Sequence, residues 1–219
     1  MPANPDAPAV PRREPRWPAL VAVLAIAAVY LSLPNRLTAG PSWLLLAVVC
    51  VLLVPVVIFH RTGRGEWNFV AGILVLAVVT AAVAWSLATL IAGLLNQQEA
   101  PKDLLRAAVV LWASNVMVFA SWYWRLDAGG PHMRDLRPSH QEGAFLFPQM
   151  TLSSRSKLAE PGWKPGFVDY LFLAFNTSTA FSPTDVPVLS RWAKALMMVQ
   201  SCISLGIVVI LAARAINIL

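Results

Sequence analysis

The strongest constraint on this chain is a series of long apolar segments, each bounded by short stretches of turn-forming and charged residues. These segments occupy residues 17–33, 42–59, 68–95 and 104–124, and a last one occupies residues 192–219. A helix of about 20 apolar residues crosses the hydrocarbon core of a bilayer. The pattern therefore predicts an all-α integral membrane protein.

The composition supports this prediction and excludes other classes. Hydrophobic residues make up 58% of the chain and charged residues only 13%, whereas a soluble domain carries about 25% charged residues. The net charge of +6 is spread over the loops between apolar segments, which is typical of membrane-flanking loops and not of a nucleic-acid-binding face. We expect the cell (inner) membrane as location, the lipid bilayer as partner, and no nucleic acid.

The order of segments predicts four regions. Residues 1–16 form a disordered tail rich in Pro and Arg, residues 17–125 a four-helix transmembrane region, residues 126–166 an extramembrane loop, and residues 167–219 a helical hairpin. In the loop we expect His132 and His140 to be solvated, since neither has metal-ligand spacing to another His or Cys. The sequence thus predicts no metal and no cofactor. Tryptophans near segment ends predict an interfacial belt, namely Trp17, Trp43, Trp67, Trp122, Trp124 and Trp192.

The predicted hairpin begins with a segment that is short for a membrane crossing. Residues 167–181 are mostly apolar, Asp169 near their start can cap a helix, and Pro183 must stop it. A half-crossing helix followed by a re-entrant turn fits this length. A short, tilted transmembrane helix followed by an ordinary polar turn fits it equally well.

Polar side chains also lie within the long apolar segments. Gln200 and Ser204 share one face of the last helix, and either lining of a water-filled pore or hydrogen bonding between helices would explain them. Asn115, midway along the fourth segment, is expected to bond across helices.

The stretch "FNTSTAFSPTD" at residues 175–185, with "DYLFLA" before it and "RWAK" and an apolar helix after it, resembles the pore loop and inner helix of potassium channels. It is also similar to bacterial multi-pass membrane proteins that end in the same degenerate pattern. The resemblance covers residues 167–217 and implies a homotetramer, monovalent cations as partners and a hinge at Gly206. The filter-like positions it implies are Thr177, Thr179, Ala180, Phe181, Ser182, Pro183, Thr184 and Asp185.

The departures from that family are as informative as the matches. Ser182 and Thr184 replace the two filter glycines, and Pro183 replaces the tyrosine. A β-branched residue at positive φ is a genuine outlier, so Thr184 is a poor substitute for glycine. If the loop conducts, hydroxyl groups of Thr179, Ser182 and Thr184 would line the path and Asp185 would attract cations. Asp185 can also be a turn residue that caps the next helix.

Two arguments about orientation disagree. The potassium-channel resemblance places the long loop outside the cell and, with four helices before it, the N-terminus outside as well. Most Lys and Arg residues, however, lie on the same side as the N-terminus, and the positive-inside rule places that side in the cytoplasm.

Three functions follow from these patterns. The first is a channel-like membrane protein that passes monovalent cations through a non-standard filter at residues 177–185. The alternative is a non-conducting scaffold or accessory subunit that keeps a relict pore-loop fold. An enzyme is disfavoured, because no apolar segment carries a carboxylate pair or a His–Ser arrangement.

Overall fold

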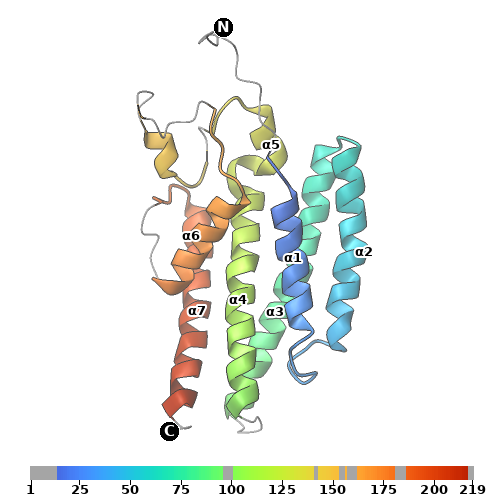
Figure 1. Cartoon of the computed structure of the whole chain (residues 1–219), viewed down its shortest axis with the longest axis vertical. Helices are drawn as coiled ribbons and strands as arrows, with labels where there is room; N and C mark the ends of the chain where they lie inside the picture. The colour runs from blue at the N-terminus through green and yellow to red at the C-terminus, as the bar shows by residue number, and fades with distance from the viewer. Residues whose placement is uncertain are drawn as a thin grey trace.

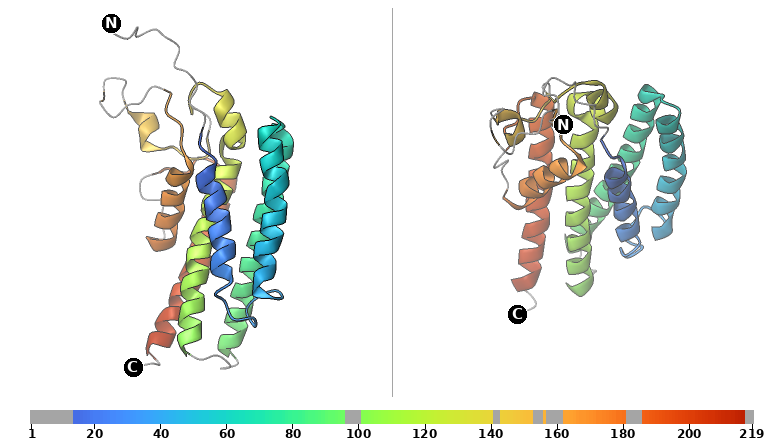
Figure 2. Two further views of the ribbon diagram at one scale, coloured as in Figure 1. Left: turned by 45° about the vertical axis from the view of Figure 1, so that its right-hand side comes forward. Right: turned by 45° about the horizontal axis from the view of Figure 1, so that its top comes forward.

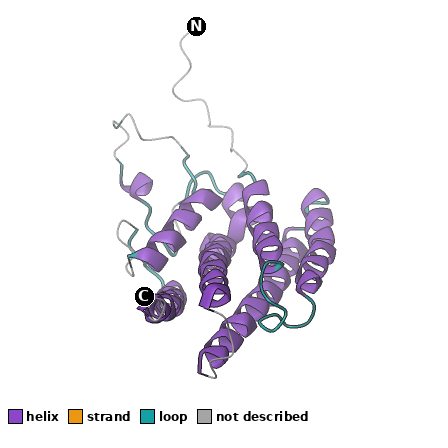
Figure 3. Cartoon of the chain, turned by 60° about the horizontal axis from the view of Figure 1, so that its bottom comes forward, coloured by secondary structure: helices purple, strands orange, loops and turns teal. Residues whose placement is uncertain are grey.

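The structure is a computed structural model, and it describes residues 14–95, 101–140, 143–152, 156, 162–180 and 186–216. These residues form an all-helical bundle with one isolated β-bridge (Figure 3). Its α-helices are α1 Trp17–Tyr30, α2 Ser42–Arg61, α3 Gly65–Leu95, α4 Pro101–Leu126, α5 Gly130–Leu136, α6 Phe167–Thr179 and α7 Arg191–Ile216. Two short 3-10 helices, η1 Asp127–Gly129 and η2 Pro148–Thr151, lie between them.

Helix α4 is the centre of the bundle. It packs against α1 and α3 on one side and against α6 and α7 on the other (Figure 1). Helix α2 lies outermost, against α1 and α3, and the same arrangement is visible from two further directions (Figure 2). The predicted hairpin, α6 and α7, is therefore one flank of the bundle and not a separate unit.

In the described part of the chain, four helical stretches are long and apolar enough to cross a membrane. They are Ser42–Arg61, Gly65–Gly93, Asp103–Leu136 and Arg191–Ile210. Large apolar side chains also cover the outside of the bundle, as on α2, where Val51 is 69% and Val54 is 56% exposed. A helix that is apolar all round requires apolar surroundings, and the bilayer supplies them. The structure thus has the form of a multi-pass membrane protein.

Helix α1 is shorter than the sequence predicts. It has 14 residues and measures about 21 Å, compared with about 30 Å for the hydrocarbon core. It ends at Tyr30 because the N–H groups of Ser32 and Leu33 donate back to Val29 and Tyr30 in a turn that precedes Pro34. The sequence predicts five crossing segments, but only four of the described helical stretches have the length to cross, because α1 is too short.

The basic residues gather at one end of the bundle. The N-terminal side of α1, the α2–α3 turn, the end of α4, helix α5 and the start of α7 all lie at this end, and the end of α7 lies at the other (Figure 1). We call it the arginine-rich end, after Arg16, Arg61, Arg64, Arg125, Arg134 and Arg191. Among the described residues, the exposed Arg36 and Arg106 lie at the opposite end of the bundle.

Helix α6 is short for a membrane crossing, as the sequence predicts. Its 13 residues begin after Gly166, whose N–H donates to the Asp169 carboxylate at 2.7 Å, so the capping role predicted for Asp169 is confirmed. After α6 the chain returns to the end of the bundle at which α6 begins. There Leu189 N–H donates to Ala144 O at 2.7 Å and Leu146 N–H donates to Pro187 O at 2.9 Å.

Candidate functional site

A buried hydrogen-bond network joins α4, α6 and α7. Gln200 is its centre: its Nε2 donates to Ala174 O at 2.7 Å and to Ser178 Oγ at 2.8 Å. Tyr123 donates its hydroxyl to Gln200 Oε1 at 2.6 Å. All polar groups of the Gln200 side chain therefore have partners within the chain. We call these residues, with Asn115 and Ser204, the hairpin network.

The fourth helix contributes the other half of this network. Asn115 Nδ2 donates to Ser204 Oγ at 2.9 Å and to Gln200 O at 3.4 Å, which confirms that Asn115 bonds across helices. Gln200 and Ser204 are both 0% exposed. The sequence leaves two explanations open for Gln200 and Ser204, pore lining and hydrogen bonding between helices. The contacts in the structure match hydrogen bonding between helices. Lining a pore would require both side chains to leave the interior.

The predicted filter residues fall into two groups. Thr177 is buried, with its hydroxyl donating to Leu173 O at 2.8 Å, whereas Thr179 and Ala180 are exposed at the end of α6. The rest of the predicted filter, Phe181, Ser182, Pro183, Thr184 and Asp185, lies outside the described residues. Gly206 is exposed, and a Cβ added there would meet open space, so its role as a hinge stays a prediction.

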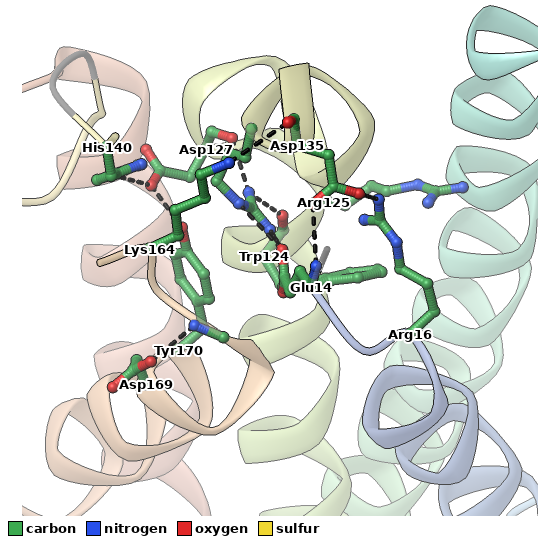
Figure 4. Close-up of polar contacts among 12 residues, drawn as sticks. Glu14, Arg16, Trp124, Arg125, Asp127, Asp135, His140, Lys164, Asp169 and Tyr170 are labelled. Carbon is green, nitrogen blue, oxygen red and sulfur yellow. Dashed lines mark hydrogen bonds and ion pairs between the residues drawn. The ribbon is translucent and has the colours of Figure 1, made fainter. Parts of the chain in front are cut away.

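The sequence does not predict the second polar assembly, a charged cluster at the arginine-rich end (Figure 4). Its centre is Arg134, which is 1% exposed. Arg134 donates to Glu14 Oε2 at 2.9 and 3.3 Å and to the carbonyl oxygens of Trp124 and Asp127 at 2.8 and 2.9 Å. Trp124 Nε1 donates to the other Glu14 oxygen. We call Glu14, Arg16, Asp127, Arg134 and Asp135 the charged cluster.

The cluster corrects the predicted N-terminal tail. The sequence places Glu14 and Arg16 in a solvated, disordered stretch, but Glu14 is only 8% exposed. Arg16 pairs with Asp135 at 2.5 Å, and the Glu14 N–H donates to the same carboxylate at 3.0 Å. Burial lowers the pKa of the Arg16 guanidinium, and the Asp135 carboxylate opposes that shift. The folded chain thus includes residues that the Pro- and Arg-rich composition assigns to the tail.

Asp127 connects the cluster to α6 and to the long loop. It is 0% exposed and accepts hydrogen bonds from the Tyr170 hydroxyl at 2.6 Å and from Ala144 N–H at 2.5 Å. His140 Nε2 lies 3.3 Å from the same carboxylate. His140 is 6% exposed, so the prediction that it is solvated is wrong: the loop folds back and buries it. His132 is exposed, as predicted.

The helix that α4 forms is broken at one short stretch, "DAGGP" at residues 127–131. Gly129 and Gly130 have φ of 79° and 87°, and Ala128 has φ of 52°. Glycine adopts positive φ without strain, so this stretch breaks the helix directly after α4, and α5 follows at the arginine-rich end of the bundle. Trp124 is 7% exposed, and it does not belong to the predicted interfacial belt. Trp17, Trp43 and Trp67 are at least 60% exposed near helix ends, as predicted.

The contacts of the charged cluster hold the N-terminal residues, α5 and α6 together at this end of the bundle. Its carboxylates are held by ion pairs and hydrogen bonds. Among the described residues, no group of His, Cys, Asp and Glu side chains is arranged to hold a metal ion. The sequence could have suggested the turn at residues 127–131, but nothing in it pairs Glu14 with Arg134 across 120 positions.

No family model, curated protein or solved structure matches this chain.

Proposed function

We propose that this chain is a multi-pass membrane protein with a re-entrant, channel-related hairpin that has a structural and non-conducting role. The bilayer is its partner and the cell (inner) membrane its location. The hairpin is re-entrant in this proposal because α6, with 13 residues, is about two thirds as long as a crossing helix, and the chain then returns to the end at which α6 begins. It corresponds to the second of the two functions that the sequence favours, a scaffold or accessory subunit.

The observation that carries this proposal is the sealed hairpin network. A conducting pore needs polar groups or backbone carbonyls that face water, but the side chains of Gln200 and Ser204 are bonded to α4 and α6 inside one chain. The exposed face of α7 carries apolar side chains instead, among them Met198, Val199, Leu205 and Val209. An assembly that turned this face toward an axis would present a dry surface to ions.

The second candidate is a cation channel formed by several copies, four by the resemblance. One observation favours it: Thr179, a filter-like position at the tip of α6, is exposed. Tips of several re-entrant hairpins that met at an axis would gather such hydroxyl groups around a path for monovalent cations.

Flux of K⁺ and Na⁺ through proteoliposomes that contain the purified chain separates the two functions. We expect no flux above that of empty liposomes, and a monomer or dimer in mild detergent. A tetramer with cation flux that both Ser182→Ala and Asp185→Asn alter would overturn the structural role and establish the channel. A matched variant at the far end of α4, Arg106→Gln, controls for non-specific leak.

A further inference from the structure

Between the first four helices, at the arginine-rich end, lies a cavity of about 260 Å³. Residues from α1, α2, α3 and α4 line it. Its volume is slightly below the roughly 300 Å³ at which small-molecule pockets begin. This space lies on the opposite side of α4 from the hairpin, so neither the hairpin network nor the proposed function explains it.

The lining changes in character along the cavity. Arg16, Arg61, Asn68 and Arg125 lie at the end where the helices leave the membrane. Deeper in the bundle, the lining is formed by Val23, Leu53, Val56, Val57, Val75 and Leu76. None of the described residues in the lining is acidic. A cationic mouth above an apolar interior matches a molecule with an anionic head and an apolar chain.

Arg125 is a buried cation at the mouth of this cavity. It is 4% exposed, and within the described part of the chain no carboxylate pairs with it. Its guanidinium donates to the carbonyl oxygen and side chain of Asn68, and it lies 5.8 Å from the ring centres of Phe69 and of Trp124. Its Nε has no hydrogen-bond partner among the described residues. A buried charge without a counter-charge is costly, and an anion in the cavity would offset that cost.

Arg16 supplies a second free donor to the same cavity. Its Nη2 is bound to Asp135, but its Nη1 is buried and has no hydrogen-bond partner among the described residues. In Figure 4 the side chains of Arg16 and Arg125 both lie on the side of the charged cluster that faces away from His140. Two guanidinium groups with free donors at one cavity form a site for a carboxylate or phosphate oxygen.

The backbone of α3 makes room for one of these groups. A Cβ added at Gly72 would lie 1.5 Å from Arg125 Nη2 and 2.4 Å from its Nε. Glycine at this position therefore lets the guanidinium lie flat against α3 at the mouth of the cavity. At the edge of the cavity, Val57 is 37% exposed, so the space is open toward the lipid.

We propose that this cavity binds an anionic amphiphile, with its carboxylate or phosphate head at Arg16 and Arg125 and an acyl chain between α1, α2 and α3. The head would accept hydrogen bonds from the free nitrogens of both arginines. The chain would displace water from the apolar part of the cavity. A fatty acid and an anionic phospholipid share this chemistry, and the cavity volume suits a head and part of one chain.

The test is ligand-dependent thermal stability of the full chain in neutral detergent, with native mass spectrometry to detect bound mass. The probes are oleate, dioleoylphosphatidylglycerol, dioleoylphosphatidylcholine and inorganic phosphate. We expect oleate or the phosphatidylglycerol to raise the melting temperature and to remain bound, which also identifies the class of head group. The zwitterionic lipid and inorganic phosphate should have much weaker effects.

Variants separate this site from general detergent and lipid effects. Because a hydrogen bond to a charged group contributes about 1.5–3 kcal/mol, Arg125→Gln should weaken binding by roughly tenfold to a hundredfold. Gly72→Ala should do the same by displacing the guanidinium. Leu53→Trp narrows the apolar part and should weaken oleate binding while it leaves the arginines intact. Arg106→Gln, at the exposed opposite end of α4, should bind like the wild type.

Three results would overturn the proposal. Inorganic phosphate that stabilises the chain as much as oleate would mean a simple anion site without a place for a chain. If the anionic and the zwitterionic lipid raised the melting temperature equally, Arg16 and Arg125 would not be recognising a negative head group. Oleate or phosphatidylglycerol binding that Arg125→Gln, Gly72→Ala and Leu53→Trp all leave unchanged would place the ligand elsewhere.

Discussion

The ion pair between Glu14 and Arg134 offers the sharpest test of how the arginine-rich end is built. Both side chains are at most 4% exposed, and they approach to 2.9 Å. Replacing Arg134 by Met keeps much of its volume but leaves the Glu14 carboxylate as an uncompensated buried charge. The carbonyl oxygens of Trp124 and Asp127 also lose their donor. Breaking a buried pair in this way costs about 3–5 kcal/mol.

The double variant should recover part of that loss. In Glu14→Gln the carboxylate is gone, so Arg134→Met on that background no longer leaves a buried charge without a partner. We expect the sum of the two single losses in the free energy of unfolding to exceed the loss of the double variant by at least about 1.5 kcal/mol. This is the lower end of the coupling energies for close charge pairs. This coupling energy reports on the pair itself and excludes general effects of each substitution.

The assay is a titration of the purified chain in mixed micelles with a denaturing detergent, followed by helix content and tryptophan fluorescence. Arg64→Met is the matched control, because Arg64 is exposed at the same end of the bundle and should change the free energy of unfolding by less than about 0.5 kcal/mol. The reasoning is refuted if the single variants change the free energy of unfolding as little as Arg64→Met does, or if their effects are additive. Glu14 would then be a solvated residue of the tail.

Three further predictions concern the rest of the chain. Tyr170→Phe removes a hydrogen bond of 2.6 Å to Asp127 and should lower the free energy of unfolding by about 1–3 kcal/mol in the same titration; an unchanged value would contradict the contact. Gln200→Leu should cost about 1–2 kcal/mol, as for hydrogen bonds between membrane helices, and should not open a cation leak in liposomes. Reporters fused after Leu219 and inserted between residues 143 and 152 should lie on opposite sides of the membrane; the same side would mean that α6 crosses fully.

The sequence predicts the helices of this fold well. Residues 42–59, 68–95 and 104–124 lie within α2, α3 and α4, because a run of apolar residues in a bilayer must satisfy its backbone in a helix. The start of α6 was also predictable, since Asp169 caps it. The helix ends at Thr179, and Pro183, which the sequence expects to stop it, lies outside the described residues. Helix α1 shows the limit of the method: the apolar pattern continues to Leu33, but turn geometry before Pro34 ends the helix at Tyr30.

The polar sites were less predictable, for a physical reason. Hydropathy identifies Gln200 and Asn115 as polar groups among apolar ones, but it cannot tell a side chain that faces water from one bonded to a neighbouring helix. For the charged cluster even the location is hidden. Glu14 and Arg134 each look like ordinary loop charges, and only the fold of residues 127–131 over the end of the bundle buries them together.

The charged cluster also sharpens the question of orientation. Charges that are paired inside the protein, such as Arg16 and Arg134, contribute little to the positive-inside bias, since that bias reflects basic residues in loops and flanks. Setting them aside still leaves the exposed residues Arg61, Arg64, Arg191 and Lys194 at the arginine-rich end, against Arg36 and Arg106 at the other. The remaining bias argues that the arginine-rich end faces the cytoplasm.

With this orientation, helix α6 enters the membrane from the cytoplasmic side, opposite to the pore loop of potassium channels. A hairpin that is inverted, and that bonds its polar residues within the chain, is a poor candidate for a filter of that type, so orientation and hydrogen bonding argue independently for the structural role.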